Sequence, residues 1–95
     1  MLQHRQLDIE ESAEIRLEPL YSVVLWDDSI NTLMAAVRAV QTVFRYDYGV
    51  CLQLTWIAHR HGCSVVQRGL SYEVAEHRRN GLRSLGFLAS MVPSE

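Results

Sequence analysis

The 95-residue chain has no lysine, only two cysteines and two prolines, and no long apolar run. All nine basic residues are arginine, and the formal net charge is −2. This balance excludes a nucleic-acid binder held mainly by phosphate contacts, because such proteins concentrate positive charge. No apolar run approaches the ~20 residues of a membrane-spanning helix, and the first ten residues lack the apolar centre of a secretory signal. We therefore expect a protein of the cytoplasm, or of an organelle after loss of a transit peptide, with neither a membrane nor a nucleic acid as partner.

The sequence also lacks the signatures of common enzyme classes. It contains no HExxH, P-loop or GxGxxG motif, and none of its serines lies in a GxSxG setting. Cys51 and Cys63 have no CxxC spacing, and without export we expect reduced thiols. A small metal-binding or hydrolytic protein that uses His59, His61 and Cys63 is one hypothesis. It is disfavoured because two histidines at i and i+2 of a helix point apart and a structural zinc site takes four ligands. We expect no metal, no cofactor and no catalytic activity.

The composition changes at Pro19. Residues 1–19 hold five acidic residues against two arginines, whereas residues 20–95 hold six acidic residues and seven arginines. We predict a flexible acidic N-terminal extension over residues 1–19 and one folded domain over residues 20–95. A domain of this length can bury a modest core without disulfides or metals.

The hydrophobic pattern predicts six elements. Strands are expected over residues 20–26, 63–67 and 87–92, where apolar residues alternate or cluster. Helices are expected from residue 31 or 32 to 45, from 48 to about 60, and from 71 to 84 or 85. Ser29 or Asn31 is the expected N-cap of the first helix. The order β-α-α-β-α-β predicts an α+β fold of two layers, with three strands in one sheet and the helices packed on one face.

An acidic bend, Asp27-Asp28-Ser29, lies between the first strand and the first helix, with Asn31 just beyond it. Short polar side chains there can cap the helix. They can also collect oxygen acceptors around an ammonium group, which has three donors. His59, near the end of the second predicted helix, offers one acceptor nitrogen when neutral, although a lone histidine is usually a surface residue. The pattern alone leaves both interpretations open.

Several segments resemble the ClpS family of adaptor proteins for ClpA- or ClpC-type AAA+ unfoldases. They are LYSVVLWDD at 20–28, VQTVFRYD at 40–47, LQL at 52–54, His59, Gly62, and EVAE at 73–76. The resemblance covers about residues 19–92 and implies a small antiparallel sheet with three helices. It also implies a non-catalytic adaptor that binds N-degrons. An N-degron is a protein N-terminus with a free α-amine and a large hydrophobic first residue. Such an adaptor delivers its substrates to the N-domain of the unfoldase.

The resemblance assigns roles to individual residues. It assigns the binding of the N-terminal amine to Asp27, Asp28, Asn31 and His59. It assigns the walls of the hydrophobic pocket to Ile30, Leu33, Ala36, Thr55, Ala58 and Phe87. The face that contacts the unfoldase carries Glu73 and Arg78.

The chain departs from the family pattern at the pocket. Asp27 stands where Asn is usual, and Leu33 and Thr55 stand where Met is usual. These changes resemble divergent second-copy members that accept fewer first residues, so we expect Leu or Phe, with Leu slightly ahead. A second hypothesis is a regulator that binds the unfoldase but has an impaired N-degron pocket. Its support is Asp27, because two crowded carboxylates should raise one carboxyl pKa and destabilise the empty site.

Overall fold

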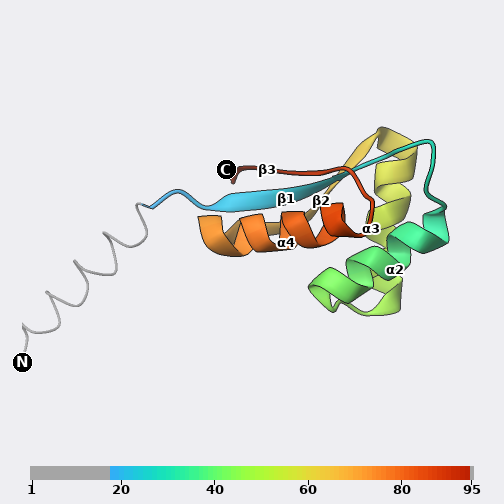
Figure 1. Cartoon of the computed structure of the whole chain (residues 1–95), viewed down its shortest axis with the longest axis horizontal. Helices are drawn as coiled ribbons and strands as arrows, with labels where there is room; N and C mark the ends of the chain where they lie inside the picture. Colours follow the sequence, from blue (N-terminus) through green and yellow to red (C-terminus); the bar gives the residue numbers. More distant parts are fainter. Residues whose placement is uncertain (1–17, 95) are drawn as a thin grey trace, which may run out of the picture.

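The computed structural model describes residues 18–94, and its elements follow the expected order (Figure 1). They are β1 (Tyr21–Trp26), α2 (Leu33–Phe44), α3 (Tyr48–His61), β2 (Cys63–Leu70), α4 (Tyr72–Ser84) and β3 (Ala89–Pro93). The predicted α+β fold of three strands and three helices is confirmed. Most of the extension expected over residues 1–19 lies outside the described residues. Within the described part, no helix is both long and apolar enough to cross a bilayer.

The three strands form one antiparallel sheet in the order β2-β1-β3. In the central strand, Leu25 pairs with Ser64 on one side and with Ala89 on the other. Strand β2 continues beyond the predicted residue 67 to Leu70, which pairs with Tyr21. Because β1 is held along both edges, the position at which it ends is well fixed.

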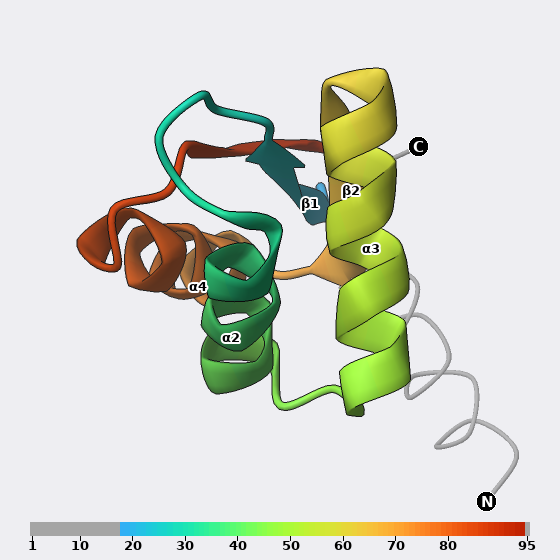
Figure 2. The ribbon, with the colours of Figure 1, turned by 90° about the vertical axis from the view of Figure 1, so that its right-hand side faces the viewer.

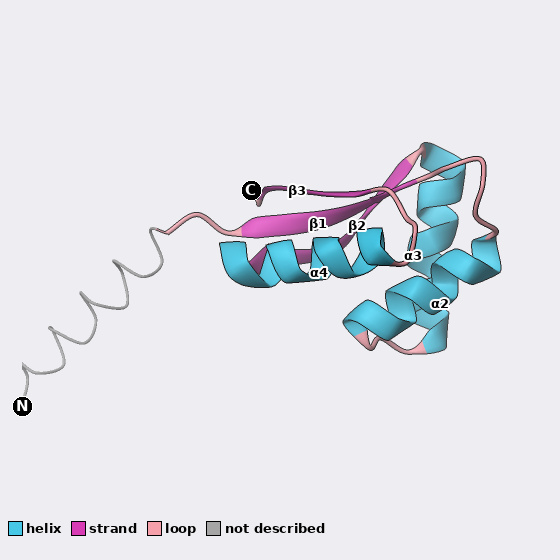
Figure 3. Ribbon diagram, in the orientation of Figure 1, coloured by secondary structure: helices cyan, strands magenta, loops and turns pink. Residues whose placement is uncertain are grey.

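The helices occupy two regions. Helix α4 lies along the sheet, whereas α2 and α3 pack together beside the end of β1 (Figures 2 and 3). In α4, a Cβ at Gly81 would lie 3.2 Å from Val43 Cγ2, so α4 approaches α2 closely there. The core joins all these elements, and its least exposed members include Val23, Val37, Val40, Cys51 and Leu82. Burial of each such apolar side chain stabilises the fold by roughly 1.5–3 kcal/mol.

Caps define the start of α2 and the end of α3, the two helix ends next to the bend. The N-cap of α2 is Thr32, whose hydroxyl oxygen accepts a hydrogen bond from the Ala35 N–H at 3.1 Å. The expectation of Ser29 or Asn31 as N-cap was therefore wrong. Helix α3 ends at His61, and its C-cap is Gly62, which has φ +95° and donates its N–H to the Ala58 carbonyl at 2.8 Å. A left-handed glycine is a common helix C-terminus.

Candidate functional site

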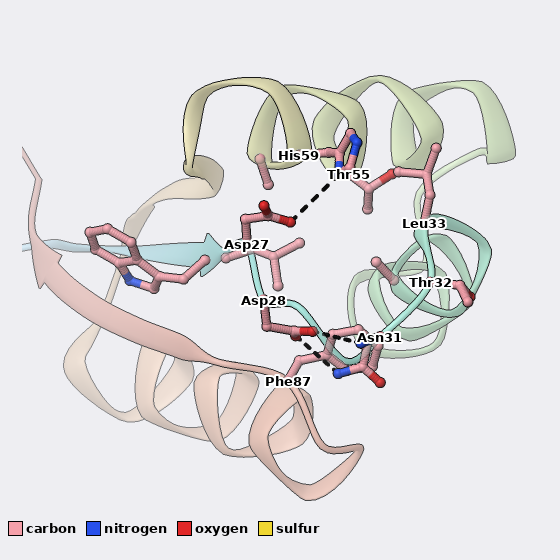
Figure 4. A pocket seen from close by; sticks show the side chains of 12 residues that line it. Asp27, Asp28, Asn31, Thr32, Leu33, Thr55, His59 and Phe87 are labelled. Carbon is pink, nitrogen blue, oxygen red and sulfur yellow. Dashed lines mark hydrogen bonds and ion pairs between the residues drawn. The ribbon is translucent and has the colours of Figure 1, made fainter.

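A cavity lies between the bend after β1, the facing sides of α2 and α3, and the loop before β3 (Figure 4). Its volume is about 30 Å³, which is room for roughly one or two water molecules. The structure brings together here nine of the ten residues assigned to the amine and the pocket. The lining residues are Leu25, Trp26, Asp27, Asp28, Asn31, Thr32, Leu33, Ala36, Thr55, Ala58, His59 and Phe87.

Backbone hydrogen bonds fix the start of the bend at the cavity. The Trp26 N–H donates to the Leu88 carbonyl at 3.0 Å, and the Asp27 N–H donates to the Gly62 carbonyl at 2.9 Å. The strand end is thus held between the loop before β3 and the C-terminus of α3. This places Asp27 next to His59, which lies in the last turn of α3.

Asp27 and His59 face one another across the mouth of the cavity (Figure 4). Asp27 Oδ1 lies 3.7 Å from His59 Nδ1, and the two side chains are 41% and 57% exposed. Within residues 18–94, no hydrogen bond to the Asp27 carboxylate is found. Its oxygens are therefore available to a ligand, and the imidazole stands beside them.

Asp28 has a different role, because its carboxylate organises the bend. Oδ1 accepts from the Ile30 N–H at 2.9 Å and the Asn31 N–H at 2.6 Å, and Oδ2 accepts from Asn31 Nδ2 at 3.0 Å. The side-chain bond from Asn31, followed by the backbone bonds, holds the pKa of Asp28 below its ordinary value, although burial acts in the opposite direction. At Asp28, hydrogen bonds and not crowding with Asp27 therefore set the direction of the pKa shift.

Asn31 connects the bend to a distant loop. Its amide nitrogen donates both to Asp28 and to the Gly86 carbonyl, each at 3.0 Å. Both amide hydrogens are engaged, so the side-chain oxygen of Asn31 is left as an acceptor. Figure 4 shows Asn31 and Phe87 on the opposite side of the cavity from His59.

The inner wall of the cavity is apolar and well packed. Thr55, Ala58 and Phe87 are 2%, 3% and 7% exposed, and Leu33 and Ala36 line the cavity from α2. The Thr55 hydroxyl donates into its own helix, at 2.8 Å from the Cys51 carbonyl and 3.1 Å from the Leu52 carbonyl. Its hydrogen is therefore engaged, and the wall presents little unsatisfied polarity to an apolar side chain.

Ile30 is the exception among the predicted wall residues. It is 89% exposed and does not line the cavity, so its assignment as a wall is corrected. The Asp28 carboxylate binds the Ile30 N–H, and the resulting turn leaves the side chain outside. The residue-based prediction also missed Leu25, Trp26 and Thr32, which do line the cavity. Their position on either side of the acidic bend was the available signal.

The residues of the metal hypothesis do not form a cluster. In the described part of the chain, no three His, Cys, Asp or Glu side chains gather as a possible metal site, and His59, His61 and Cys63 form no such group.

Glu73 and Arg78 are both on α4, and five residues correspond to roughly 140° around a helix. A partner that contacts both must therefore span the helix. The Arg78 guanidinium carbon lies 5.6 Å from the centre of the Phe44 ring.

Comparison with known proteins agrees with this architecture. Residues 16–86 match the family model described as ATP-dependent Clp protease adaptor protein ClpS. A solved structure of Agrobacterium tumefaciens ClpS2 bound to L-phenylalaninamide matches with a TM-score of 0.76 and 23% identity, covering 80% of this chain and 98% of that chain. A search of curated proteins found no match. The structural likeness supports the fold, and the family match covers more than half of the sequence. The chain therefore belongs to the ClpS family of Clp protease adaptor proteins.

Proposed function

We propose that the cavity binds the free α-amine and the large hydrophobic first side chain of N-degron proteins, and that the chain delivers them to a ClpA- or ClpC-type AAA+ unfoldase. The observation that carries this proposal is the Asp27–His59 pair, 3.7 Å apart at the mouth of a cavity whose inner wall is largely apolar. The ligand of the Agrobacterium ClpS2 structure, L-phenylalaninamide, combines a free amine with an aromatic side chain. It supports this choice of ligand class. An adaptor of an ATP-dependent protease acts beside that protease, which we place in the cytoplasm.

The acceptors at the mouth suit an ammonium group. Charge-assisted hydrogen bonds have lengths of about 2.8 Å, so two acceptors of one tetrahedral nitrogen lie roughly 4.6 Å apart. The observed 3.7 Å thus needs an opening of about 1 Å, which two half-exposed side chains can provide. Asp27 supplies a carboxylate oxygen, and the imidazole of His59 supplies an acceptor nitrogen. The third acceptor comes from Asn31 Oδ1 or from the remaining lone pair of Asp28.

The affinity depends on both halves of the ligand. Burial of one large apolar side chain contributes about 1.5–3 kcal/mol, and each hydrogen bond to a charged group contributes ~1.5–3 kcal/mol. After the cost of association, a dissociation constant of micromolar order results. An acetylated amine loses its charge and two of its three donors, so the Asp27 carboxylate would be left without its cationic partner. We expect such a ligand to be rejected.

The small cavity bears on which side chain is accepted. About 30 Å³ must widen before a leucine or phenylalanine side chain enters. Leu33, half-buried in the first turn of α2, is the wall that we propose moves. Leucine requires less widening than phenylalanine, so we place Leu slightly ahead. The same small volume favours a second candidate function, in which the pocket stays closed and the chain regulates the unfoldase only.

Peptide binding distinguishes these functions. We expect micromolar binding of Leu- and Phe-initiated peptides by fluorescence anisotropy, and at least a tenfold loss when the amine is acetylated. Asp27→Ala should cause a similar loss. Asp47→Ala is the matched control, because it removes the same charge far from the cavity at a side chain that makes no capping bond to α3. Equal affinity for Leu-, Phe-, Tyr-, Trp-, Ile- and Ala-initiated peptides would refute the pocket. Unfoldase binding without any peptide binding would favour the regulator.

A further inference from the structure

A second, larger apolar groove borders the cavity. Its volume is about 440 Å³, and it is lined by Leu33, Gly49, Leu52, Gln53 and Trp56. The last four occupy positions i, i+3, i+4 and i+7 of α3, which share one side of a helix. Leu33 lines both the groove and the cavity, so this one side chain borders both. None of the lining side chains is charged.

Trp56 connects this groove to the amine end of the site. Its ring centre lies 5.7 Å from the ring centre of His59, one turn further along α3. Trp56 is 48% exposed, although it is the largest apolar side chain of the groove. Between α2 and α3, Met34 and Tyr48 extend the apolar surface, with the Tyr48 hydroxyl 3.8 Å from Met34 Sδ. Their exposed fractions are 46% and 45%. Contiguous exposed apolar surface of this kind marks an interaction site.

The spacing along α3 matches an extended peptide. Gln53, at the middle of the groove, precedes His59 by six residues, which is about 9 Å along the axis. An extended peptide advances roughly 3.3–3.6 Å per residue. A peptide whose amine is held at His59 therefore reaches the groove with its second or third residue, after crossing Leu33.

We infer that this groove binds an apolar side chain at the second or third position of the same N-degron. The inference rests on the proposed function and deepens it: the chain recognises a short apolar N-terminal sequence and not the first residue alone. The shared wall residue Leu33 and the contact of Trp56 with His59 select this occupant. The residues that line the groove are uncharged, and burial of an unpaired carboxylate is costly, so acidic residues at these positions bind poorly.

The test uses the full chain and peptides that begin with Leu and carry Leu, Gly or Asp at the second or the third position. We expect Leu to bind at least fivefold more tightly than Gly at one of these positions, and Asp to bind more weakly than Gly. Trp56→Ala should reduce the Leu-to-Gly ratio to less than about twofold. Val50→Ala is the matched control, because Val50 is 45% exposed on the same helix and lines neither hollow.

The ratio within each variant isolates the groove from changes at His59, since those alter both peptides equally. Gln53→Leu, at an exposed position, should raise the ratio above that of the unmodified chain and provides a second readout. Amine-dependent binding with no preference at either position overturns this inference and leaves the proposed function standing. Failure of every free-amine peptide to bind overturns both. A preference that survives Trp56→Ala also overturns the groove as its source.

Discussion

Replacement of Asp28 by alanine should destabilise the fold, whereas replacement of its neighbour Asp27 should not. The Asp28 carboxylate accepts three hydrogen bonds within the bend, which resembles the work of a helix N-cap. Loss of such a cap costs about 0.5–2 kcal/mol, and three acceptor contacts place Asp28→Ala at about 1–2 kcal/mol. For a domain of this size each kcal/mol lowers Tm by roughly 4–8 °C. We therefore expect a decrease of about 5–15 °C by far-UV circular dichroism.

The pH dependence provides a second signature of the same carboxylate. Its hydrogen bonds hold the pKa of Asp28 below the ordinary value of 3.8 in the folded state. The folded state thus binds this proton less readily than the unfolded state. The stabilisation is fully present above the unfolded pKa and is lost as pH falls through the folded pKa. The difference in Tm between the unmodified chain and Asp28→Ala should be constant between about pH 5 and 7 and should shrink below about pH 4.

Asp27→Ala is the control for this prediction. The Asp27 side chain approaches His59 at 3.7 Å and is 41% exposed, and an exposed pair of this kind contributes little to stability. We expect a change of Tm below about 2 °C together with loss of peptide binding. Equal melting temperatures for Asp28→Ala and the unmodified chain at neutral pH would refute our account of the bend. An equally large decrease in Asp27→Ala would refute it as well.

Three further changes probe the packing and the cavity. Gly81→Leu should cost about 1–3 kcal/mol in urea unfolding, because a Cβ there already lies 3.2 Å from Val43 and overpacking is destabilising; unchanged stability would show that α2 and α4 separate easily. Leu33→Ala should raise the affinity for Phe- and Trp-initiated peptides several-fold relative to Leu-initiated ones, since it widens the cavity; an unchanged ratio would remove Leu33 as the moving wall. Thr55→Val should lower the free energy of unfolding by less than about 1.5 kcal/mol, because the Thr55 hydroxyl only supplements the helical hydrogen bond at the Cys51 carbonyl. Weaker binding of Leu-initiated peptides by this variant would contradict an apolar role for the wall.

Periodicity was sufficient for the elements but not for the bend. Alternation located β1, and helical spacing located all three helices, because each reports one buried face of a regular element. In the bend, direction is set by individual hydrogen bonds. The Asp28 carboxylate occupies the N–H groups of Ile30 and Asn31, so that α2 starts only at Leu33, after its N-cap Thr32, and Ile30 stays in solvent. No periodic pattern carries that information.

Other features depend on contacts between distant segments. The resemblance selected Asp27 and His59, and the structure brings them together because the Asp27 N–H bonds to the Gly62 carbonyl. The longer β2 follows from its pairing with Tyr21 and from Gly69, which has φ +70° within the strand. The groove beside Trp56 forms only because α2 packs across α3. From the sequence alone, the half-exposed Trp56 could not be distinguished from a core residue.

The hydrogen bond from Asn31 to the Gly86 carbonyl has a consequence for communication across the domain. It joins the rim of the cavity to the residue after the C-cap of α4, the helix that we propose contacts the unfoldase. Binding that displaces Gly86 alters the geometry of Asn31 and, through it, of Asp28. Thermodynamic linkage makes any such coupling reciprocal: the factor by which the unfoldase changes affinity for an N-terminal amine is the factor by which that amine changes affinity for the unfoldase. If the chain binds both proposed ligands, the side-chain amide of Asn31 thus couples the two binding equilibria.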